Sequence, residues 1–487
     1  MKPFRVLVFV LSVFGILFLL AIFFPRDGIS LGSDMRLRFY DATTLFQKDT
    51  VSTAYTDSLI RHATVTDDPE EGEVDTLLFR PAPVILARPD PELDSLIKAH
   101  VDSIRNTVYP IEFGGNSRKQ MYAFFRKAEN SLPDDKLIRI LHYGDSQIEN
   151  DRMTSLLRNR LQRVFGGGGC GMVPAIPLYY GNPAFMEEYQ GDWRRYTGFG
   201  KKDSTLQHNC YGTLASFTSI PLAEEDRLPY LDFEFRKGRR ASDFNTMKLW
   251  LHANEANAAI IFHLNDTISD TIRNLPAGYQ ELQVFPGGPA QNVRLEFNFP
   301  EGGRVYGIGF DSRAGVQVDN IAMRGSSGLV FSKMDRQHLD TMMQTLNPGL
   351  LILQFGGNVV PYIKNVSYYR KKFNRELLFL KELLPGVPIL VVGPADMSTK
   401  ENGKFVTFPA LIGVRDALRE AALSNGCSYW DMFEAMGGEN SISNFVMADP
   451  PLATADYIHF TPRGANLMAG MLFDAIMFEY NHYKLDE

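Results

Sequence analysis

Apolar runs and helical stripes alternate along two stretches of the chain. Residues 137–142 form an apolar run with the length of a buried strand, and residues 151–165 carry apolar side chains at helical spacing. After a long gap the rhythm returns, which predicts strands at 350–355, 388–392 and 428–430 and helices within 361–384, 409–425 and 463–480. Strands that alternate with helices predict an α/β fold with a parallel sheet covered on both faces.

The long gap between these stretches has a different pattern. Residues 231–235 and 293–299 alternate apolar and polar side chains with a period of two, and glycine-rich turns separate such segments. We therefore predict an antiparallel β-sandwich at residues 180–320, inserted into an α/β domain formed by residues 111–179 and 321–487. Its aromatic residues, Trp193 and Trp250 among them, could stack on sugar rings, but a place in the core is the favoured interpretation for each one.

The N-terminal segment predicts a membrane anchor. Residues 6–24 contain no charged side chain, and a run of 19 such residues is long enough to cross a bilayer as a helix. Lys2 and Arg5 precede this run, which predicts a cytoplasmic N-terminus and an extracytoplasmic remainder. A cleaved signal peptide is the alternative, but the run ends in aromatic residues instead of small ones. We predict a signal anchor at residues 1–27 on the inner membrane, followed by an acidic spacer at residues 28–110 on the periplasmic side.

Charge and composition exclude several classes of function. The chain has 487 residues, of which 22% are charged, and a net charge of −7 without basic clusters, so we expect no nucleic-acid partner. The nine histidines are dispersed, and the three cysteines have no metal-binding spacing. We therefore expect no metal and no cofactor. The cysteine pattern leaves one disulfide open, with at least one thiol unpaired.

Candidate chemistry begins where the first predicted strand ends. Gly144-Asp145-Ser146 follows that strand directly, and ligand sites in open α/β sheets lie at the carboxyl ends of strands. Ser146 precedes the helix predicted at residues 151–165, and a helix N-terminus there would favour developing negative charge. Near the other end of the chain, Asp456 precedes His459 by three residues, just before the last predicted helix. A serine, a histidine and an aspartate are the minimum set for acyl transfer through a serine nucleophile.

Two further glycine-containing motifs can supply hydrogen-bond donors to an oxyanion. Asn358 follows two glycines after the strand at 350–355, and its amide could point at a developing negative charge. Gly325 follows the predicted insertion, where the absence of a side chain lets a backbone N–H approach a substrate. Taken singly, each motif is equally typical of an ordinary turn.

The four motifs in this order resemble the SGNH (GDSL-type) hydrolase superfamily. They are Gly144-Asp145-Ser146, Gly325-Ser326-Ser327-Gly328, Gly356-Gly357-Asn358 and Asp456-Tyr457-Ile458-His459. The resemblance covers residues 137–175 and 321–480 and implies a flavodoxin-like parallel sheet. It implies Ser146 as nucleophile, His459 as base and Asp456 as its orienting acid, with an oxyanion hole from the Ser146 N–H, the Gly325 N–H and the Asn358 amide. Val359 departs from the family pattern, which has an aspartate after the asparagine.

The interrupted architecture is similar to that of bacterial peptidoglycan O-acetylesterases and related polysaccharide O-acetyl-modifying proteins. The resemblance implies a cofactor-free serine esterase that removes O-acetyl groups from a cell-envelope glycan. An O-acetyltransferase that uses the same residues, together with a membrane partner that exports acetyl groups, remains an alternative. A non-catalytic glycan-binding protein is a second alternative, against which the complete set of four motifs argues.

Overall fold

The computed structural model describes residues 108–177, 181–223, 227–265, 267–286, 288 and 290–486, with four residue pairs nearer the N-terminus at 29–30, 36–37, 55–56 and 59–60. The chain divides into two compact units, Met1–Ala54 and Tyr55–Glu487. In the first, strands β1 (Ile29–Ser30) and β2 (Arg36–Leu37) pair antiparallel. The predicted anchor helix and most of the predicted spacer lie outside the described residues. Among the helices that can be described, none is long and apolar enough to cross a membrane.

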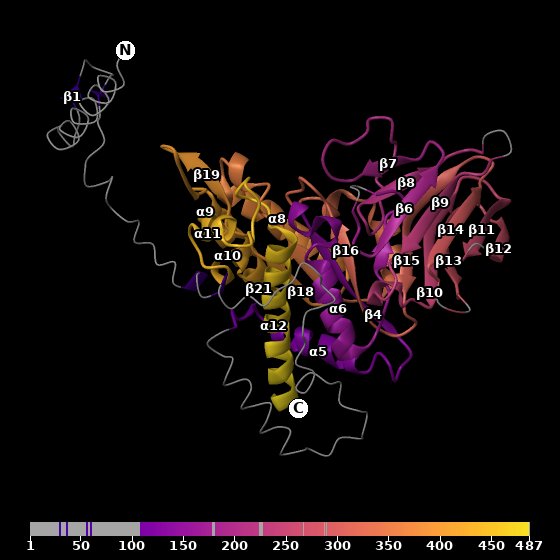
Figure 1. Cartoon of the computed structure of the whole chain (residues 1–487), viewed down its shortest axis with the longest axis horizontal. Coiled ribbons are helices and arrows are strands. Elements are labelled where there is room, and N and C mark those ends of the chain that lie inside the picture. Colours follow the sequence, from indigo (N-terminus) through magenta and orange to yellow (C-terminus); the bar gives the residue numbers. More distant parts are fainter. Residues whose placement is uncertain are drawn as a thin grey trace, which may run out of the picture. The chain divides into compact units, whose positions relative to one another are not determined.

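A six-stranded sheet organises the second unit (Figure 1). Its five parallel strands confirm the predicted α/β fold, and the edge strand β3 pairs antiparallel with β21. In spatial order the strands are β16 (Gly315–Ala322), β4 (Leu137–Gly144), β17 (Pro348–Gln354), β18 (Ile389–Val392), β21 (Ser428–Trp430) and β3 (Glu112–Phe113).

Alternate residues of these strands enter two apolar clusters, one on each face of the sheet. Ile140 and Ile352 belong to the first cluster, and their neighbours Leu141 and Leu353 belong to the second. Because both faces are covered, β17 and β18 are buried at every position, which explains why their sequences are apolar except at Gln354. The first cluster contains residues of α5 (Ser117–Glu129), α6 (Thr154–Phe165), α10 (Met432–Ala435), α11 (Ser441–Met447) and α12 (Pro462–Asp486). The second contains residues of α7 (Arg336–Leu346), α8 (Val366–Leu383) and α9 (Leu411–Ser424).

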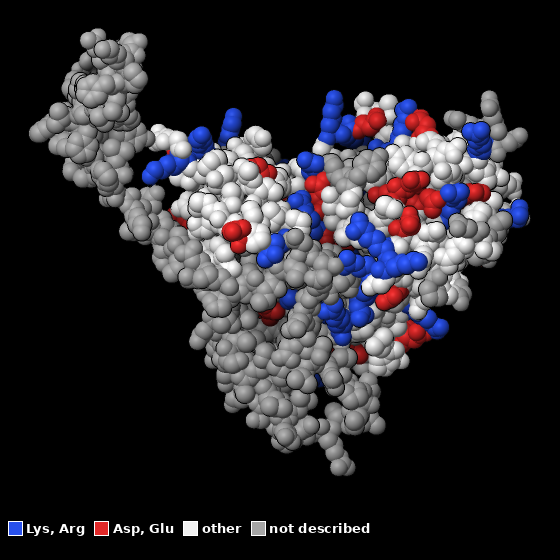
Figure 2. All heavy atoms as spheres, in the orientation of Figure 1, with Lys and Arg blue, Asp and Glu red and all other residues white. Residues whose placement is uncertain are grey.

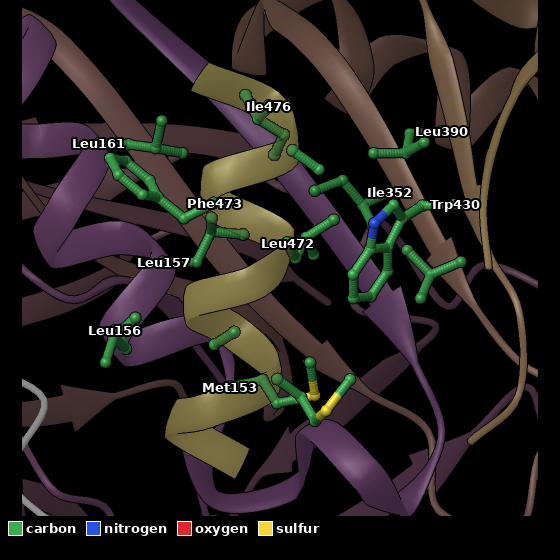
Figure 3. Packing of buried hydrophobic residues seen from close by; sticks show 14 of the residues in the cluster. Met153, Leu156, Leu157, Leu161, Ile352, Leu390, Trp430, Leu472, Phe473 and Ile476 are labelled. Atoms are coloured by element: carbon green, nitrogen blue, oxygen red, sulfur yellow. The ribbon is translucent and has the colours of Figure 1, made fainter. Parts of the chain in front are cut away.

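Figure 3 shows the first cluster from close by. Leu472 and Ile476 of α12 lie between Leu157 of α6 and the sheet residues Ile352 and Trp430. The last helix was predicted within residues 463–480, and it extends to Asp486, with Tyr483 buried beyond the predicted end. This helix supports the sheet beneath the strand that leads to Ser146.

Two antiparallel sheets form the inserted part, at the position where the sequence predicts a sandwich. They share one apolar cluster, and the period-two strands β9 and β14 each bury alternate residues. Trp193 is 6% exposed and Trp250 is fully buried, so both are core residues. One sheet has the order β13 (Gly278–Val284), β10 (Thr246–Ala253), β15 (Gly303–Asp311), β8 (Ser216–Ile220) and β7 (Arg194–Thr197), with β5 (Gly171–Val173) beside β15. The other has the order β12 (Thr267–Leu275), β11 (Ala258–Leu264), β14 (Asn292–Asn298), β9 (Tyr230–Phe235) and β6 (Phe185–Gln190).

The boundaries of the insertion differ from the predicted 180–320. Strand β5 already belongs to the inserted sheets, and β16 belongs to the parallel sheet from Gly315 onward. The sequence of β16 alternates apolar and polar residues, which is typical of a half-buried strand. In the structure its polar residues Gln317 and Asp319 are buried, because they bond to other buried polar groups. The alternation of apolar and polar residues in β16 therefore reflects one apolar face and one polar face, both of them buried.

A buried ion network joins the inserted sheets to the parallel sheet. Arg139 of β4 binds both carboxylate oxygens of Asp319 on β16, at 2.8 and 2.9 Å, and also pairs with Asp311 of β15. Asp319 in turn accepts the N–H of Met172 at 2.7 Å. Burial raises the pKa of Asp311 and Arg139 opposes that shift. The three charged side chains are almost completely excluded from water, so the network is stable only as a complete set.

Basic and acidic side chains are interspersed over the described part of the face shown in Figure 2, without a continuous basic surface.

The remaining elements are short. They are the hairpin of β19 (Ser398–Glu401) and β20 (Lys404–Thr407), and the 3₁₀ helices η1 (Ser146–Asp151), η2 (Arg240–Ser242), η3 (Phe331–Lys333) and η4 (Val360–Tyr362).

Replacement of Arg139 by methionine tests the importance of the network. We expect the free energy of unfolding to fall by about 3–5 kcal/mol, because two carboxylates remain buried without their cation. Urea-induced unfolding measures the change. Arg194→Met is the matched control, since it breaks a pair with Asp192 whose side chains are 68% and 72% exposed, and it should cost less than about 1 kcal/mol. Equal losses in the two variants would contradict the assigned role.

Candidate active site

Backbone hydrogen bonds between three neighbouring strands set the position of Ser146. The Gly144 carbonyl accepts the N–H of Met323, at 2.7 Å, just after β16 ends. On the other side, the Asp145 N–H donates to the Gln354 carbonyl of β17 at 3.2 Å. A Cβ at Gly144 would lie 2.9 Å from the Ile148 side chain and 3.2 Å from the Gln354 carbonyl, so the close packing at this strand end favours glycine. Ser146 therefore projects from the carboxyl edge of the sheet, as the sequence predicts.

A 3₁₀ turn separates Ser146 from the α-helix that follows it. Ser146 starts the 3₁₀ helix η1, and Asn150 and Asp151 then adopt left-handed backbone angles, with φ of 56° and 60°. The helix predicted at residues 151–165 is confirmed as α6, which begins at Thr154. The contribution of its dipole at Ser146 stays a prediction.

The structure brings Ser146, His459 and Asp456 together across more than 300 residues of sequence. Ser146 Oγ lies 2.9 Å from His459 Nε2, and His459 Nδ1 lies 2.7 Å from Asp456 Oδ2. With the ring proton on Nδ1, His459 donates to Asp456 and can accept the serine proton at Nε2. This is the hydrogen-bonded order that nucleophile activation requires.

Hydrogen bonds stabilise the charged form of Asp456, whose side chain is 46% exposed. Partial burial raises its pKa, but hydrogen bonds from the side chain of His459, the Thr454 hydroxyl and the N–H groups of His459 and Ile458 outweigh that effect. They hold the pKa of Asp456 well below its usual range. Asp456 is thus a permanent anion that orients the histidine. The sequence identifies Asp456 but carries no signal for the contribution of Thr454.

The pKa of Asp145, in the same site, shifts in the opposite direction. Its carboxylate is 3% exposed, and burial raises its pKa to about 6. The N–H of Gln147, the charge on His459 and the Asn358 side chain oppose this shift without cancelling it. Asp145 accepts the Gln147 N–H at 3.1 Å and so caps the turn that presents Ser146.

Asn358 and Gly325 both lie in loops at the carboxyl edge of the sheet. Asn358 lines the cleft that contains Ser146 and His459, and its Nδ2 lies 3.4 Å from the Ser326 carbonyl, a long hydrogen bond that an oxyanion could replace. Gly325 has φ of 76° and open space where a side chain would stand, but it is not among the residues that line this cleft. The oxyanion-hole assignments therefore stay predictions.

Val359 stands where the family pattern has an aspartate, and its packing accounts for the difference. Its N–H donates to the Gly356 carbonyl at 2.9 Å, and its side chain is 8% exposed within the second apolar cluster. An apolar residue thus fills core space behind Asn358, and the turn retains its hydrogen bond.

The cleft above Ser146 has a volume of about 190 Å³ and opens to solvent. Beyond the polar site residues it is lined by apolar side chains, namely Phe355, Pro361, Tyr362, Pro394, Ala395, Met397, Met432 and Ile458. Tyr362 is 83% exposed, although large aromatic side chains are usually covered.

The described residues contain no cluster of three or more metal-ligating side chains, and Cys170, Cys210 and Cys427 are free thiols.

Substitution of Asp145 by asparagine tests the burial of this carboxylate. A raised pKa in the folded state means stability that is present below the usual pKa of 3.8 and lost as pH rises through about 6. We expect Asp145→Asn to gain stability relative to the wild type between pH 4 and pH 8, by up to about 3 kcal/mol. Urea unfolding at several pH values measures the difference, with Asp192→Asn as the matched exposed control. A difference that shrinks as pH rises would contradict this assignment.

No protein-family model matches the sequence, and no curated protein matches it significantly. Among solved structures, one described as "Peptidoglycan O-acetylesterase in action" is 20% identical, with a TM-score of 0.59 over 76% of this chain and 97% of that chain. A GDSL-like lipase from Parabacteroides merdae is 17% identical, over 34% of this chain and 74% of its own. An acetyl xylan esterase is 15% identical, over 33% and 81%. The last two have TM-scores of 0.26 and carry no argument.

The first of these similarities spans both the parallel sheet and the inserted sheets, since it covers 76% of this chain. Together with the serine, histidine and aspartate at the carboxyl edge of the sheet, it shows that the chain has an SGNH/GDSL hydrolase-like fold.

Proposed function

We propose that this protein is a serine esterase that removes O-acetyl groups from a cell-envelope glycan, with peptidoglycan as the favoured polymer. The observation that carries the proposal is the continuous hydrogen-bonded chain from Ser146 through His459 to Asp456 in an open cleft. The fold shared with a peptidoglycan O-acetylesterase supports the choice of substrate class. The predicted anchor at residues 6–24 supports a periplasmic site of action at the inner membrane.

The geometry supports a two-step reaction through an acyl-enzyme. Ser146 Oγ attacks the acetyl carbonyl carbon while His459 Nε2 takes the hydroxyl proton, and Asp456 stabilises the resulting imidazolium. The carbonyl oxygen gains negative charge, for which we assign the Ser146 N–H, the Gly325 N–H and the Asn358 amide as donors.

Breakdown of this intermediate expels the sugar oxygen, which receives the proton from His459 and leaves acetyl-Ser146. Water then attacks the acetyl carbonyl with His459 again as base, releases acetate and restores the serine. If a sugar hydroxyl replaces water in this second step, the same residues perform acetyl transfer. The solvent-open cleft admits either acceptor, so the acceptor must be determined by experiment.

Three incubations of the full-length protein separate the candidate functions. The substrates are an O-acetylated glycan, 4-nitrophenyl acetate, and that ester together with unacetylated glycan. Acetate release that falls at least about 10⁴-fold in Ser146→Ala supports the esterase, and we expect Asp456→Asn to lose about 10³- to 10⁴-fold. Ser204→Ala, at an exposed serine of the inserted part, is the matched control.

Other outcomes of this experiment point elsewhere. Acetylated sugar formed in the third incubation would identify an acetyltransferase, working with a membrane partner that supplies acetyl groups. Retained glycan binding without turnover of any substrate would exclude both catalytic functions and leave a glycan-binding protein.

Tyr362 offers a test of the substrate class. An exposed aromatic ring at the rim of the cleft can stack on the apolar face of a sugar whose acetyl group reaches Ser146. We expect Tyr362→Ala to raise KM for the acetylated glycan three- to tenfold, which corresponds to about 0.5–1.5 kcal/mol, and to leave 4-nitrophenyl acetate hydrolysis unchanged. Tyr362→Phe should behave like the wild type. Tyr368→Ala, also exposed but outside the cleft, is the control. Equal effects on both substrates would contradict a sugar-stacking role.

A further inference from the structure

Two side chains that follow the nucleophile bond to the backbone on either side of the base. Gln147 Nε2 donates to the Ile458 carbonyl at 2.7 Å, and Arg152 Nη1 donates to the Phe460 carbonyl at 3.4 Å. We propose that Gln147 and Arg152 are positioning residues, which hold the base loop (residues 453–461) against the nucleophile turn (residues 146–152). They thereby set the distance between Ser146 Oγ and His459 Nε2. This inference rests on the serine chemistry proposed above.

The guanidinium of Arg152 bonds to the backbone of Ser146 and to the backbone next to His459. Its Nη2 donates to the carbonyl of Ser146 at 2.5 Å, while Nη1 reaches the carbonyl of Phe460, next to His459. Its Nε donates to the Glu149 carbonyl at 3.0 Å, which anchors the guanidinium in the nucleophile turn. A guanidinium is planar, so these three bonds hold the two segments in one fixed geometry. The side chain is 22% exposed, which limits competition from water.

The other hydrogen bonds of the base loop shape it without fixing its distance from Ser146. The Thr454 N–H and hydroxyl donate to the His459 carbonyl, and the Ser398 N–H donates to the Tyr457 carbonyl. Within the described part of the chain, the hydrogen bonds found between the loop and the nucleophile turn are those of Gln147, Arg152 and the Ser146–His459 pair itself. The first two are therefore the directional contacts that can hold the pair in register before substrate binds.

Loss of this register has a predictable kinetic effect. A displacement of about 1 Å between reacting groups can cost about 10²-fold in rate, while substrate binding elsewhere in the cleft stays intact. We expect Gln147→Leu and Arg152→Met each to lower kcat with 4-nitrophenyl acetate by about 10- to 100-fold and to leave KM within about twofold. The rate at which a phosphonofluoridate labels Ser146 should fall in parallel, because labelling needs the same activated serine.

Two variants separate geometry from charge. Arg152→Lys keeps the positive charge but replaces the fork with a single ammonium, so it should remain impaired. Arg324→Met removes a second guanidinium that lies 3.5 Å from the Glu149 carboxylate, and it should keep kcat within about threefold. Normal rates in Arg152→Lys, or equal losses in Arg324→Met and Arg152→Met, would overturn the proposal in favour of a simple charge effect.

A spectroscopic measurement tests the register without any substrate. In ¹⁵N-histidine spectra of the full-length protein, assigned with His459→Gln, the His459 Nε2 signal reports its hydrogen bond to Ser146. We expect that signal to shift in Gln147→Leu and Arg152→Met and to stay unchanged in Arg324→Met. Unchanged His459 signals in the first two variants would overturn the positioning role, whatever the activity. A shifted signal in a protein whose wild type turns over no ester would instead retain the positioning role and reject the proposed function.

Discussion

The buried pairing of Arg139 with Asp311 and Asp319 is the constraint on which the rest of the structure depends. It lies where strands of the parallel sheet and of the inserted sheets meet, so it holds β16 at the edge of the parallel sheet. The register of β16 then places Met323 against Gly144, directly before the nucleophile. The buried ion network therefore helps to set the position of Ser146 through the register of β16.

A polar residue of β16 also bonds to the turn that follows Ser146. Asn320 donates to the Ile148 carbonyl and to the Thr154 hydroxyl, both at 2.7 Å, and so holds the irregular turn after Ser146. Arg158 also contacts that turn through Asp151 and donates to the Val318 carbonyl of β16. Side-chain hydrogen bonds thus hold the irregular turn that follows Ser146.

Two carboxylates in the site differ because their surroundings differ. Asp456 is nearly half exposed but accepts hydrogen bonds from four donors, which favour its anion. Asp145 is buried, and burial favours its neutral form more strongly than its few donors favour the charge. One carboxylate can therefore orient His459 at any moderately acidic pH, while the other serves to cap the turn. The division of roles follows from solvation and hydrogen bonding, since both residues are aspartates.

The sequence alone predicted the parallel strands β4, β17, β18 and β21, the helices α6, α8, α9 and α12, and the inserted antiparallel sheets, because these depend on local periodicity. Short motifs pointed to Ser146, His459 and Asp456. The sequence also assigned residues 315–320 of β16 to the insertion, since alternation looks the same whatever packs against it. Only the tertiary structure decided that the polar face of β16 is buried and that Gln147 and Arg152 reach the loop around His459. These contacts join segments that lie between 147 and 311 residues apart, so the partners meet only once the sheet has assembled.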